Sequence, residues 1–288
     1  MRLDREQTSH NIEDRRGMRL SGGKGGMGIG AVVLALLASY FFGIDTQTAL
    51  NIASGLQGGA PAQAVDVPSQ RPPESDETAT FVAKVLGSTE RVWSEIFAES
   101  GSRYEPPTLV LFTGQTPTAC GTGDAAMGPF YCPADRKVYI DLAFFHELRT
   151  RFQAPGDFAQ AYVIAHEVGH HVQNLLGIST EVQRARQNAR NQAQSNLLSV
   201  RLELQADCFS GVWASRADES RSILEEGDIE EGIQAASAVG DDTLQKQATG
   251  RVVPDAFTHG SSQQRVYWFK QGMKTGDLNQ CNTFEVRK

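Results

Sequence analysis

The chain has 288 residues, of which 40% are hydrophobic, and a formal net charge of −7. This is an ordinary globular composition with enough apolar residues for one good-sized core. A mildly acidic chain without a basic stripe lacks the electrostatic footprint of a DNA- or RNA-binding protein, so we expect no nucleic-acid partner. No feature of the composition fixes an oligomeric state.

The first quarter of the chain has the pattern of a membrane signal anchor. Residues 1–26 carry six Lys or Arg residues, and residues 27–44 then contain no charged residue. A helix over this run would be about 27 Å long, just enough to cross a bilayer. The positive-inside rule makes residues 1–26 a basic cytoplasmic tail and places the rest of the chain outside the cytoplasm. A cleaved signal peptide is the alternative, but Ala62-Gln63-Ala64 lies too far behind the apolar run for the usual cleavage geometry.

A linker and one exported domain are expected after the anchor. Residues 45–75 are poor in aromatic residues and contain several Gly and Pro residues, which predicts a flexible linker. The folded domain is then expected over residues 76–288. It contains all four cysteines, and a location outside the cytoplasm favours disulfides. Three pairings are open, one of which joins Cys120 to Cys132 and Cys208 to Cys281.

Helical and strand patterns both occur in the domain, which predicts an α+β fold. Residues 76–97 have apolar side chains at helical spacing, residues 108–112 form an apolar strand pattern, and residues 137–140 form a shorter one. The strand at 137–140 is expected at an edge of the sheet, where an extended substrate can add as a further strand. Further helices are expected to begin at Asp157, Thr180, Asp228 and Ser261.

The most informative stretch is His166-Glu167-Val168-Gly169-His170, in a predicted helix that runs to Leu176. Residues four apart lie on the same face of a helix, so His166 and His170 can bind one metal ion. Glu167 lies next to them, where it can act as general base on a water, as in the HExxH zinc peptidases. A chance match is the alternative, and with only six histidines in the chain it is the weaker one.

Two acidic residues on a later predicted helix complete this candidate site. A hydrolytic zinc site needs three protein ligands and one open position for water. Glu203 fits the role of third ligand, and Asp207, one turn later, can accept the second N–H of a ligating histidine. Two such acids are usually a solvated helix edge, and only the neighbouring HExxH pattern favours the metal interpretation.

His259, in a loop before the last predicted helix, is a candidate catalytic residue. If it folds over the metal, it can donate a hydrogen bond to the oxyanion of a tetrahedral intermediate. A loop histidine is more often an ordinary surface residue. Tyr139 and Tyr162 are weaker candidates for the same role, and His146 and His171 are expected to have none.

Five separate stretches resemble the predicted neutral zinc metallopeptidases of bacterial inner membranes. They are HNIEDRRG at 10–17, PFYCPADRKVYIDLAFF at 129–145, HEVGHHVQ at 166–173, ELQADC at 203–208 and HGSSQQR at 259–265. The resemblance implies a zincin-like α+β peptidase domain held at the inner membrane by one helix, with its catalytic domain in the periplasm. ELQAD is also similar to the ExxxD of the gluzincin group, which supports Glu203 as a ligand and Asp207 as its neighbour.

The sequence therefore predicts a membrane-anchored endopeptidase with one Zn²⁺ per chain, which cleaves proteins or peptides outside the cytoplasm. His166, His170 and Glu203 are the predicted ligands, and Glu167 is the predicted general base. One alternative is an inactive zinc-binding interaction module of the cell envelope, against which the intact Glu167 argues. The other is a structural protein without metal, against which the three ligand positions argue.

Overall fold

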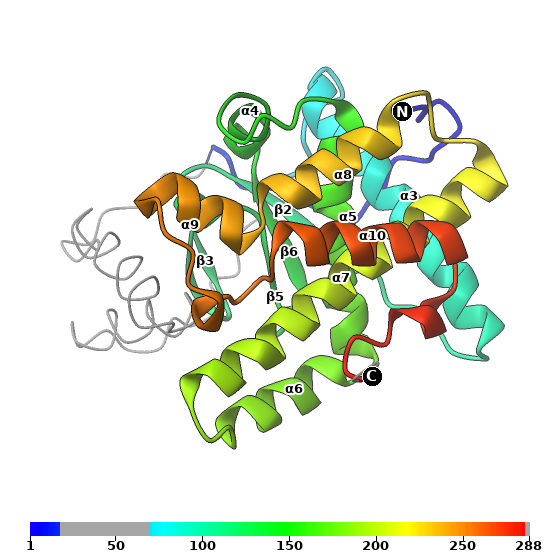
Figure 1. Cartoon of the computed structure of the whole chain (residues 1–288). Coiled ribbons are helices and arrows are strands. Elements are labelled where there is room, and N and C mark those ends of the chain that lie inside the picture. Colours follow the sequence, from blue (N-terminus) through cyan, green and yellow to red (C-terminus); the bar gives the residue numbers. More distant parts are fainter. Residues whose placement is uncertain (18–69, 286–288) are drawn as a thin grey trace.

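The structure is a computed structural model, and it describes residues 1–17 and 70–285 (Figure 1). Both described parts belong to one α+β fold, a small mixed sheet with helices packed against it. The predicted membrane span at 27–44 and nearly all of the predicted linker at 45–75 lie outside the described residues. Within the described ranges, no helix has the length and apolar character needed to cross a bilayer.

The sheet has four strands in the order β1-β2-β6-β5. The strands are β1 (Ile12–Asp14), β2 (Thr108–Phe112), β5 (Phe130–Cys132) and β6 (Lys137–Asp141). Strands β1 and β6 run parallel to β2, whereas β5 runs antiparallel to β6. Four of the five residues of β2 and of β6 are buried, which is the burial expected of interior parallel strands.

Strand β6, predicted at 137–140 as an edge strand, is an interior strand. It pairs with β2 on one side and with β5 on the other, so the prediction of a free edge was wrong. The edge strands are β1 and β5, and the one beside β6 is β5, which has only three residues. A strand this short gives too little alternation of polar and apolar residues to be recognised in the sequence. A hairpin of β3 (Gln115–Thr118) and β4 (Gly121–Asp124) precedes it.

Residues 1–17 are part of this fold, which corrects the prediction of a separate basic tail. Ile12 of β1 is buried, and β1 pairs along its whole length with β2. Glu13 forms an ion pair of 2.7 Å with Lys137 of β6, and Arg16 forms one with the N-cap residue of α3. Paired strands have to lie on the same side of a membrane. A cytoplasmic N-terminus is therefore not compatible with an exported domain in this fold.

The described residues contain eight α-helices, which Figure 1 shows around the sheet. They are α3 (Glu77–Glu99), α4 (Ala143–Thr150), α5 (Asp157–Leu175), α6 (Ile178–Gln187), α7 (Gln192–Arg221), α8 (Asp228–Ala238), α9 (Asp241–Thr249) and α10 (Ser262–Thr275). The predicted helix start at Ser261 is confirmed, because Ser261 is the N-cap of α10 and forms a capping box with Gln264. Helix α9 was not predicted, because its short and mostly polar sequence has no clear apolar stripe.

The predicted N-caps of α5 and α8 were wrong by one residue. Gly156 and Gly227 occupy the cap positions, with φ angles of 112° and 97° that glycine adopts without strain. Asp157 is instead the first residue of α5, and its carboxylate lies 2.8 Å from the amino group of Met1. The start of α5 is therefore tied to the N-terminal segment.

Helix α5 lies at the centre of the fold, with α3, α7 and α8 packed around it and β5 and β6 beside it. Its first turn carries Phe158, whose ring stacks on Trp213 of α7 and contacts Phe269 of α10. Fourteen of the nineteen residues of α5 are buried, so the helix packs against its neighbours on most of its faces. Neighbours on several sides fix the direction in which each side chain of α5 points.

Two disulfides close the fold, and they follow one of the three pairings that the sequence left open. Cys120 is bonded to Cys132, which fastens the β3–β4 hairpin to the edge strand β5. Cys208 of α7 is bonded to Cys281, which fastens the segment after α10 to α7. All four cysteines of the chain are paired in these two bonds.

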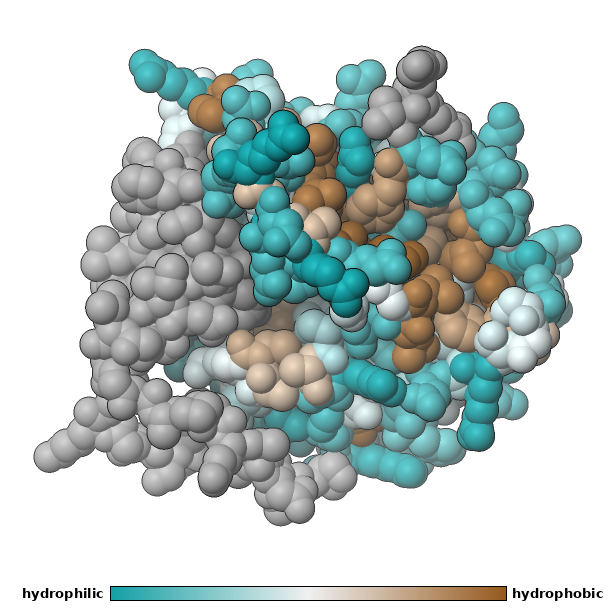
Figure 2. All heavy atoms as spheres, turned by 90° about the horizontal axis from the view of Figure 1, so that it is seen from below, coloured by the Kyte–Doolittle hydropathy of each residue, from teal (hydrophilic) through white to brown (hydrophobic). Residues whose placement is uncertain are grey.

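The surface combines hydrophilic and hydrophobic side chains. Figure 2 shows a face on which hydrophilic residues surround a smaller area of hydrophobic ones. Six large hydrophobic residues in the described part of the chain are at least 38% exposed: Leu176, Leu197, Ile229, Val252, Val253 and Tyr267. Single exposed hydrophobic residues are common on protein surfaces, so we assign none of them a function.

Replacement of Ile12 by Asp tests whether residues 1–17 belong to the fold. The substitution places a charged group in the buried contact between β1 and the core, so we expect the free energy of unfolding to fall by about 3 kcal/mol. Urea unfolding of the full chain measures this change. Thr8→Asp, at an exposed position of the same segment, is the control and should unfold like the parent. Equal stability of Ile12→Asp and the parent would show that β1 does not pair with β2.

Candidate metal centre

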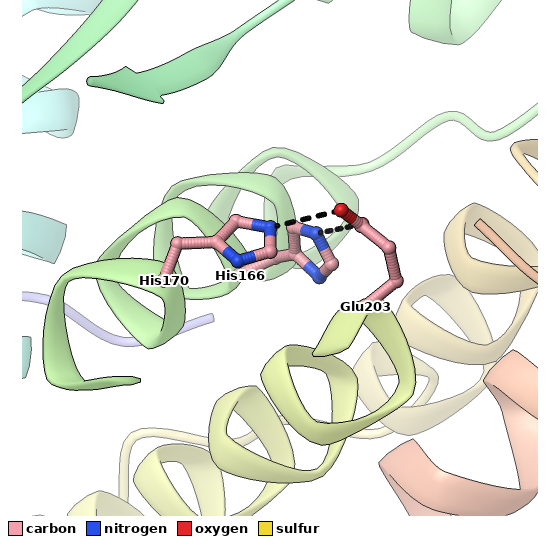
Figure 3. A group of neighbouring side chains, drawn as sticks. All are labelled: His166, His170 and Glu203. Carbon is pink, nitrogen blue, oxygen red and sulfur yellow. Dashed lines mark hydrogen bonds and ion pairs between the residues drawn. The ribbon is translucent and has the colours of Figure 1, made fainter. Parts of the chain in front are cut away.

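The two histidines of the HExxH pattern lie on α5, with their rings directed to the same side (Figure 3). The ring centroids of His166 and His170 are 4.8 Å apart and the ring planes are nearly perpendicular. The two residues are four positions apart, about one helical turn, so their side chains lie one above the other on the same face of the helix. The helix thus presents two imidazole nitrogens to one point in space.

Glu203 reaches that point from α7. One of its carboxylate oxygens lies 3.2 Å from Nε2 of His166, and the other lies 3.4 Å from Nε2 of His170. The donor atoms of the three residues all lie within 4.8 Å of one another. In tetrahedral zinc sites the ligand atoms lie 2.0–2.2 Å from the metal, which puts them about 3.3 Å apart. The two N···O distances therefore match the spacing of tetrahedral zinc ligands, and the three side chains can be donors to one zinc ion.

The chemistry of these donors also fits catalytic zinc. Two histidine nitrogens and one carboxylate oxygen form one of the three-ligand sets that leave a fourth position open. A second cluster, Asp157, Asp228 and Glu231, has oxygen donors only, a set that suits magnesium or calcium better than zinc. The amino group of Met1 lies 2.8 Å from Asp157 and 3.4 Å from Asp228, so a cationic group of the chain already pairs with two of these three acids.

Gly169 allows the two ligand-bearing helices to approach closely. A Cβ atom at this position would lie 3.1 Å from the backbone oxygen of Ala206 on α7 and 3.3 Å from its Cβ. Such contacts are tighter than ordinary van der Waals packing. The glycine between the two histidines thus brings Glu203, one turn before Ala206, within reach of both imidazoles.

A buried carboxylate orients the first histidine. Nδ1 of His166 lies 2.9 Å from Oδ1 of Asp207, which is fully buried. Burial alone would raise the pKa of Asp207, but the charges of Arg265 and His166 and their hydrogen bonds together outweigh it, and the pKa is lowered. The ionised carboxylate only accepts hydrogen bonds, so Nδ1 of His166 carries the proton. Nε2 faces Glu203 and is the nitrogen available to a metal ion, the geometry expected of a zinc-binding histidine.

Gln173 orients the second histidine, and the sequence analysis missed it. Its side-chain oxygen lies 2.9 Å from Nδ1 of His170, and its amide nitrogen donates to the backbone oxygen of Leu202 on α7. This amide carries no net charge, so the two ligands differ in the charge of the group that orients them. The only signal in the sequence was the spacing of three residues on one helix, which brings side chains together.

Glu167 lies beside the ligand cluster and is buried. Burial is the largest influence on its pKa, which is raised above the ordinary value for glutamate. A raised pKa makes the carboxylate a better proton acceptor near neutral pH. The environment of Glu167 therefore suits the role that the HExxH pattern assigns to it.

His259 lies near the ligand cluster, close enough for its charge to interact with that of Glu203. The carboxylate of Asp241 lies 3.2 Å from Nδ1 of His259 and also accepts the backbone N–H of residues 258–260. Burial lowers the pKa of His259, but the charge of Asp241 and its hydrogen bond outweigh this and raise the pKa to about 9. The side chain is 46% exposed, so burial counts for less here than the pairing with Asp241.

The two tyrosines considered in the sequence analysis have other partners. The hydroxyl of Tyr162 donates to Asp207, and that of Tyr139 donates to Asp135. Tyr139 belongs to a second small hydrophobic cluster between β2, β5 and β6. Neither hydroxyl is free to act on a substrate at the metal.

The other histidines near the pattern have no place in the cluster. His171 is fully buried, where it bonds Tyr131 of β5 and the backbone oxygen of Glu105. Burial lowers the pKa of its imidazole to about 4, so it is neutral at physiological pH. His146 is exposed on α4. His171 thus attaches α5 to the sheet, and neither residue belongs to the ligand cluster.

Arg265 is a second residue that the sequence analysis missed. It lies in the first turn of α10, is 4% exposed and forms an ion pair of 2.8 Å with Asp207. The HGSSQQR stretch contained it, but an arginine on a mostly polar helix segment has no helical pattern that predicts burial. The contact with Asp207 depends on the packing of α10 on α7.

Comparison with known families agrees with this geometry. Residues 1–284 match the protein family described as "Putative neutral zinc metallopeptidase". The match includes all of the strands, the ligand-bearing helices and the N-terminal segment. The chain belongs to this family.

Two relatives show how far the similarity extends. The "Uncharacterized protein YpfJ" of Escherichia coli K12 is 48% identical over 295 residues, which cover 99% of each chain. The "Uncharacterized protein Rv2575" of Mycobacterium tuberculosis is 46% identical over 209 residues, 69% of this chain and 68% of its own. No solved structure matches the chain. Family and site together point to zinc as the metal.

Proposed function

We propose that this protein is a zinc-dependent endopeptidase that cleaves proteins or peptides. The observation that carries the proposal is the convergence of His166, His170 and Glu203, whose donor atoms all lie within 4.8 Å of one another, with Glu167 beside them. Membership of a zinc peptidase family supports the same reaction class. A bound Zn²⁺ supplies Lewis acidity, which polarises a carbonyl group and makes water nucleophilic near neutral pH.

Glu167 acts as the general base and then as the general acid. It accepts a proton from the water that attacks the peptide carbonyl, and it later delivers that proton to the leaving amine. Burial favours the protonated carboxyl group that exists between these two transfers. One residue can thus carry the proton from the nucleophile to the leaving group.

His259 stabilises the oxyanion that forms from the carbonyl. Its Nδ1 faces Asp241, which leaves Nε2 free to donate a hydrogen bond toward the substrate. An imidazolium stabilises negative charge at the reacting centre better than a neutral donor does. Asp241 supports this role because it keeps His259 protonated and holds the loop by three backbone bonds.

The site of action is proposed to lie outside the cytoplasm. The two disulfides favour an oxidising compartment such as the periplasm. Attachment to the inner membrane through residues 27–44 is a proposal from the sequence alone, and because β1 pairs with β2, any such segment would have to enter and leave the membrane on the same side. An extended substrate that adds to the sheet would use β5, which is the edge strand in contact with α5.

A zinc-binding interaction module without activity is the alternative function. It would need the same three ligands but neither Glu167 nor His259. The buried glutamate beside the ligands is costly to keep ionised, and the endopeptidase proposal gives it a role. The two proposals differ in whether the protein cleaves a substrate.

Glu167→Gln separates them. We expect the variant to bind zinc like the parent, because the three ligands are unchanged, and to cleave an unfolded protein such as casein about 10²–10⁴ times more slowly. Metal analysis and the rate of peptide release measure the two properties. Glu181→Gln, at an exposed position of α6, is the control and should retain full activity. Equal rates for Glu167→Gln and the parent would rule out the proposed general base.

The pairing of His259 with Asp241 predicts a loss of activity at alkaline pH. The raised pKa of His259, about 9, keeps the imidazolium present below that pH, and the donor is lost as the pH rises through it. A cation bound near Glu203 opposes part of the increase in the pKa of His259, so the decline of kcat is expected at or somewhat below pH 9. Asp241→Asn should move the decline to lower pH, because Asp241 raises this pKa.

The pH dependence of kcat for the two proteins measures this shift. Asp255→Asn, an exposed acid in the same loop, serves as the control and should leave the profile unchanged. A profile of Asp241→Asn that coincides with that of the parent would remove His259 from the mechanism.

A further inference from the structure

We infer that Arg265 is a positioning residue of the metal centre, acting through Asp207 on His166. It fixes the Asp207 carboxylate in the orientation in which that group accepts the Nδ1–H of His166. The inference rests on the proposed zinc site and adds a residue outside the ligand set. Its consequence is that the N-terminal end of α10 controls how well α5 binds metal.

The contact between Arg265 and Asp207 is bidentate. Nε of Arg265 lies 2.8 Å from Oδ2, and Nη2 lies 2.9 Å from Oδ1. Both side chains are buried, at 5% and 0% exposure. Two parallel bonds between a planar guanidinium and a carboxylate fix the plane of the carboxylate, which a single bond cannot do.

The fixed carboxylate determines which nitrogen of His166 is protonated. Oδ1 of Asp207 accepts hydrogen bonds from Nη2 of Arg265, the hydroxyl of Tyr162 and Nδ1 of His166. Nη2 of Arg265 is also 3.4 Å from Nδ1 of His166, but both atoms are donors toward the same oxygen and do not bond each other. A carboxylate turned away from Nδ1 would leave the ring free to rotate. Nε2 would then lose its fixed direction toward the metal position.

Close packing of α10 on α7 holds Arg265 in place. A Cβ atom on Gly272 of α10 would lie 1.9 Å from the backbone oxygen of Cys208, and one on Gly211 of α7 would lie 2.2 Å from that of Phe269. The two backbones therefore touch where only glycine fits. The guanidinium is held further by a bond of 3.2 Å from Nη1 to the backbone oxygen of Val239.

The balance of charge gives Arg265 a second effect on the same site. Three carboxylates meet here, those of Glu167, Glu203 and Asp207, and all are buried or partly buried. One Zn²⁺ offsets two of the three negative charges, and Arg265 offsets the third. Unbalanced charge in a buried site is unfavourable, so the loss of Arg265 should weaken the site even where the ligands remain.

The affinity of the full chain for Zn²⁺ tests the inference, measured by competition with a chromogenic chelator of known affinity. We expect Arg265→Gln to weaken Zn²⁺ binding about 10–100-fold, as is typical for residues that orient metal ligands. Arg265→Lys, which keeps the charge but not the bidentate contact, should lie between the parent and Arg265→Gln. Arg265 acts through Asp207. Arg265→Gln should therefore weaken Zn²⁺ binding much less in the Asp207→Asn variant than it does in the parent.

Arg221 provides a matched control for loss of a buried arginine. It forms a buried ion pair with Glu6, with side-chain exposures of 7% and 0%, and belongs to a different cluster of residues. Arg221→Gln should lower the unfolding midpoint in urea, yet the folded protein should bind Zn²⁺ like the parent. Arg265→Gln is compared under the same folded conditions, and Arg265→Lys replaces it if it does not fold.

The possible failures are distinguishable. A parent protein that binds no Zn²⁺ overturns the proposed function itself. A parent that binds Zn²⁺ as tightly as both Arg265 variants overturns only the inference about Arg265. Equal weakening by Arg221→Gln and Arg265→Gln also overturns it, because the effect would then come from general loss of stability.

Discussion

The close contact between α5 and α7 at Gly169 and Ala206 is the constraint on which the metal centre depends. The pair of histidines follows from one helix alone, but a third ligand has to come from another element. Only at this short separation of backbones does Glu203 reach both imidazoles. The packing of α5 by α3, α8 and the sheet holds this contact in place, so the fold as a whole determines the geometry of three side chains.

Charge is the second organising feature of the site. Negative groups gather around the position of the metal, and two of them have a cationic partner of their own. Asp207 is paired with Arg265, and Asp241 is paired with His259 and three backbone N–H groups. Both cationic partners belong to the same short stretch, at the N-terminal end of α10 and just before it. This stretch connects the orientation of a ligand to the position of the proposed oxyanion donor.

Local periodicity and the chemistry of zinc predicted the ligand set from the sequence. The spacing of His166 and His170 defines a helical face, and the need for a third ligand singled out Glu203. Gln173 and Arg265 were missed, because their roles depend on contacts with α7 that no local pattern contains. The strand at 137–140 was wrongly expected at an edge of the sheet for the same reason. The pairing of β1 with β2 joins segments about ninety residues apart. The positive charges of the N-terminal residues instead led to the prediction that this strand was part of a tail.

The most direct measurement of the central claim is the position of zinc in crystals of the full chain, located by anomalous diffraction at the zinc edge. The account predicts one peak per chain, about 2.0–2.2 Å from Nε2 of His166, Nε2 of His170 and a carboxylate oxygen of Glu203. A zinc-loaded crystal with no peak between these atoms, or with its peak at the Asp157, Asp228 and Glu231 cluster, would contradict it.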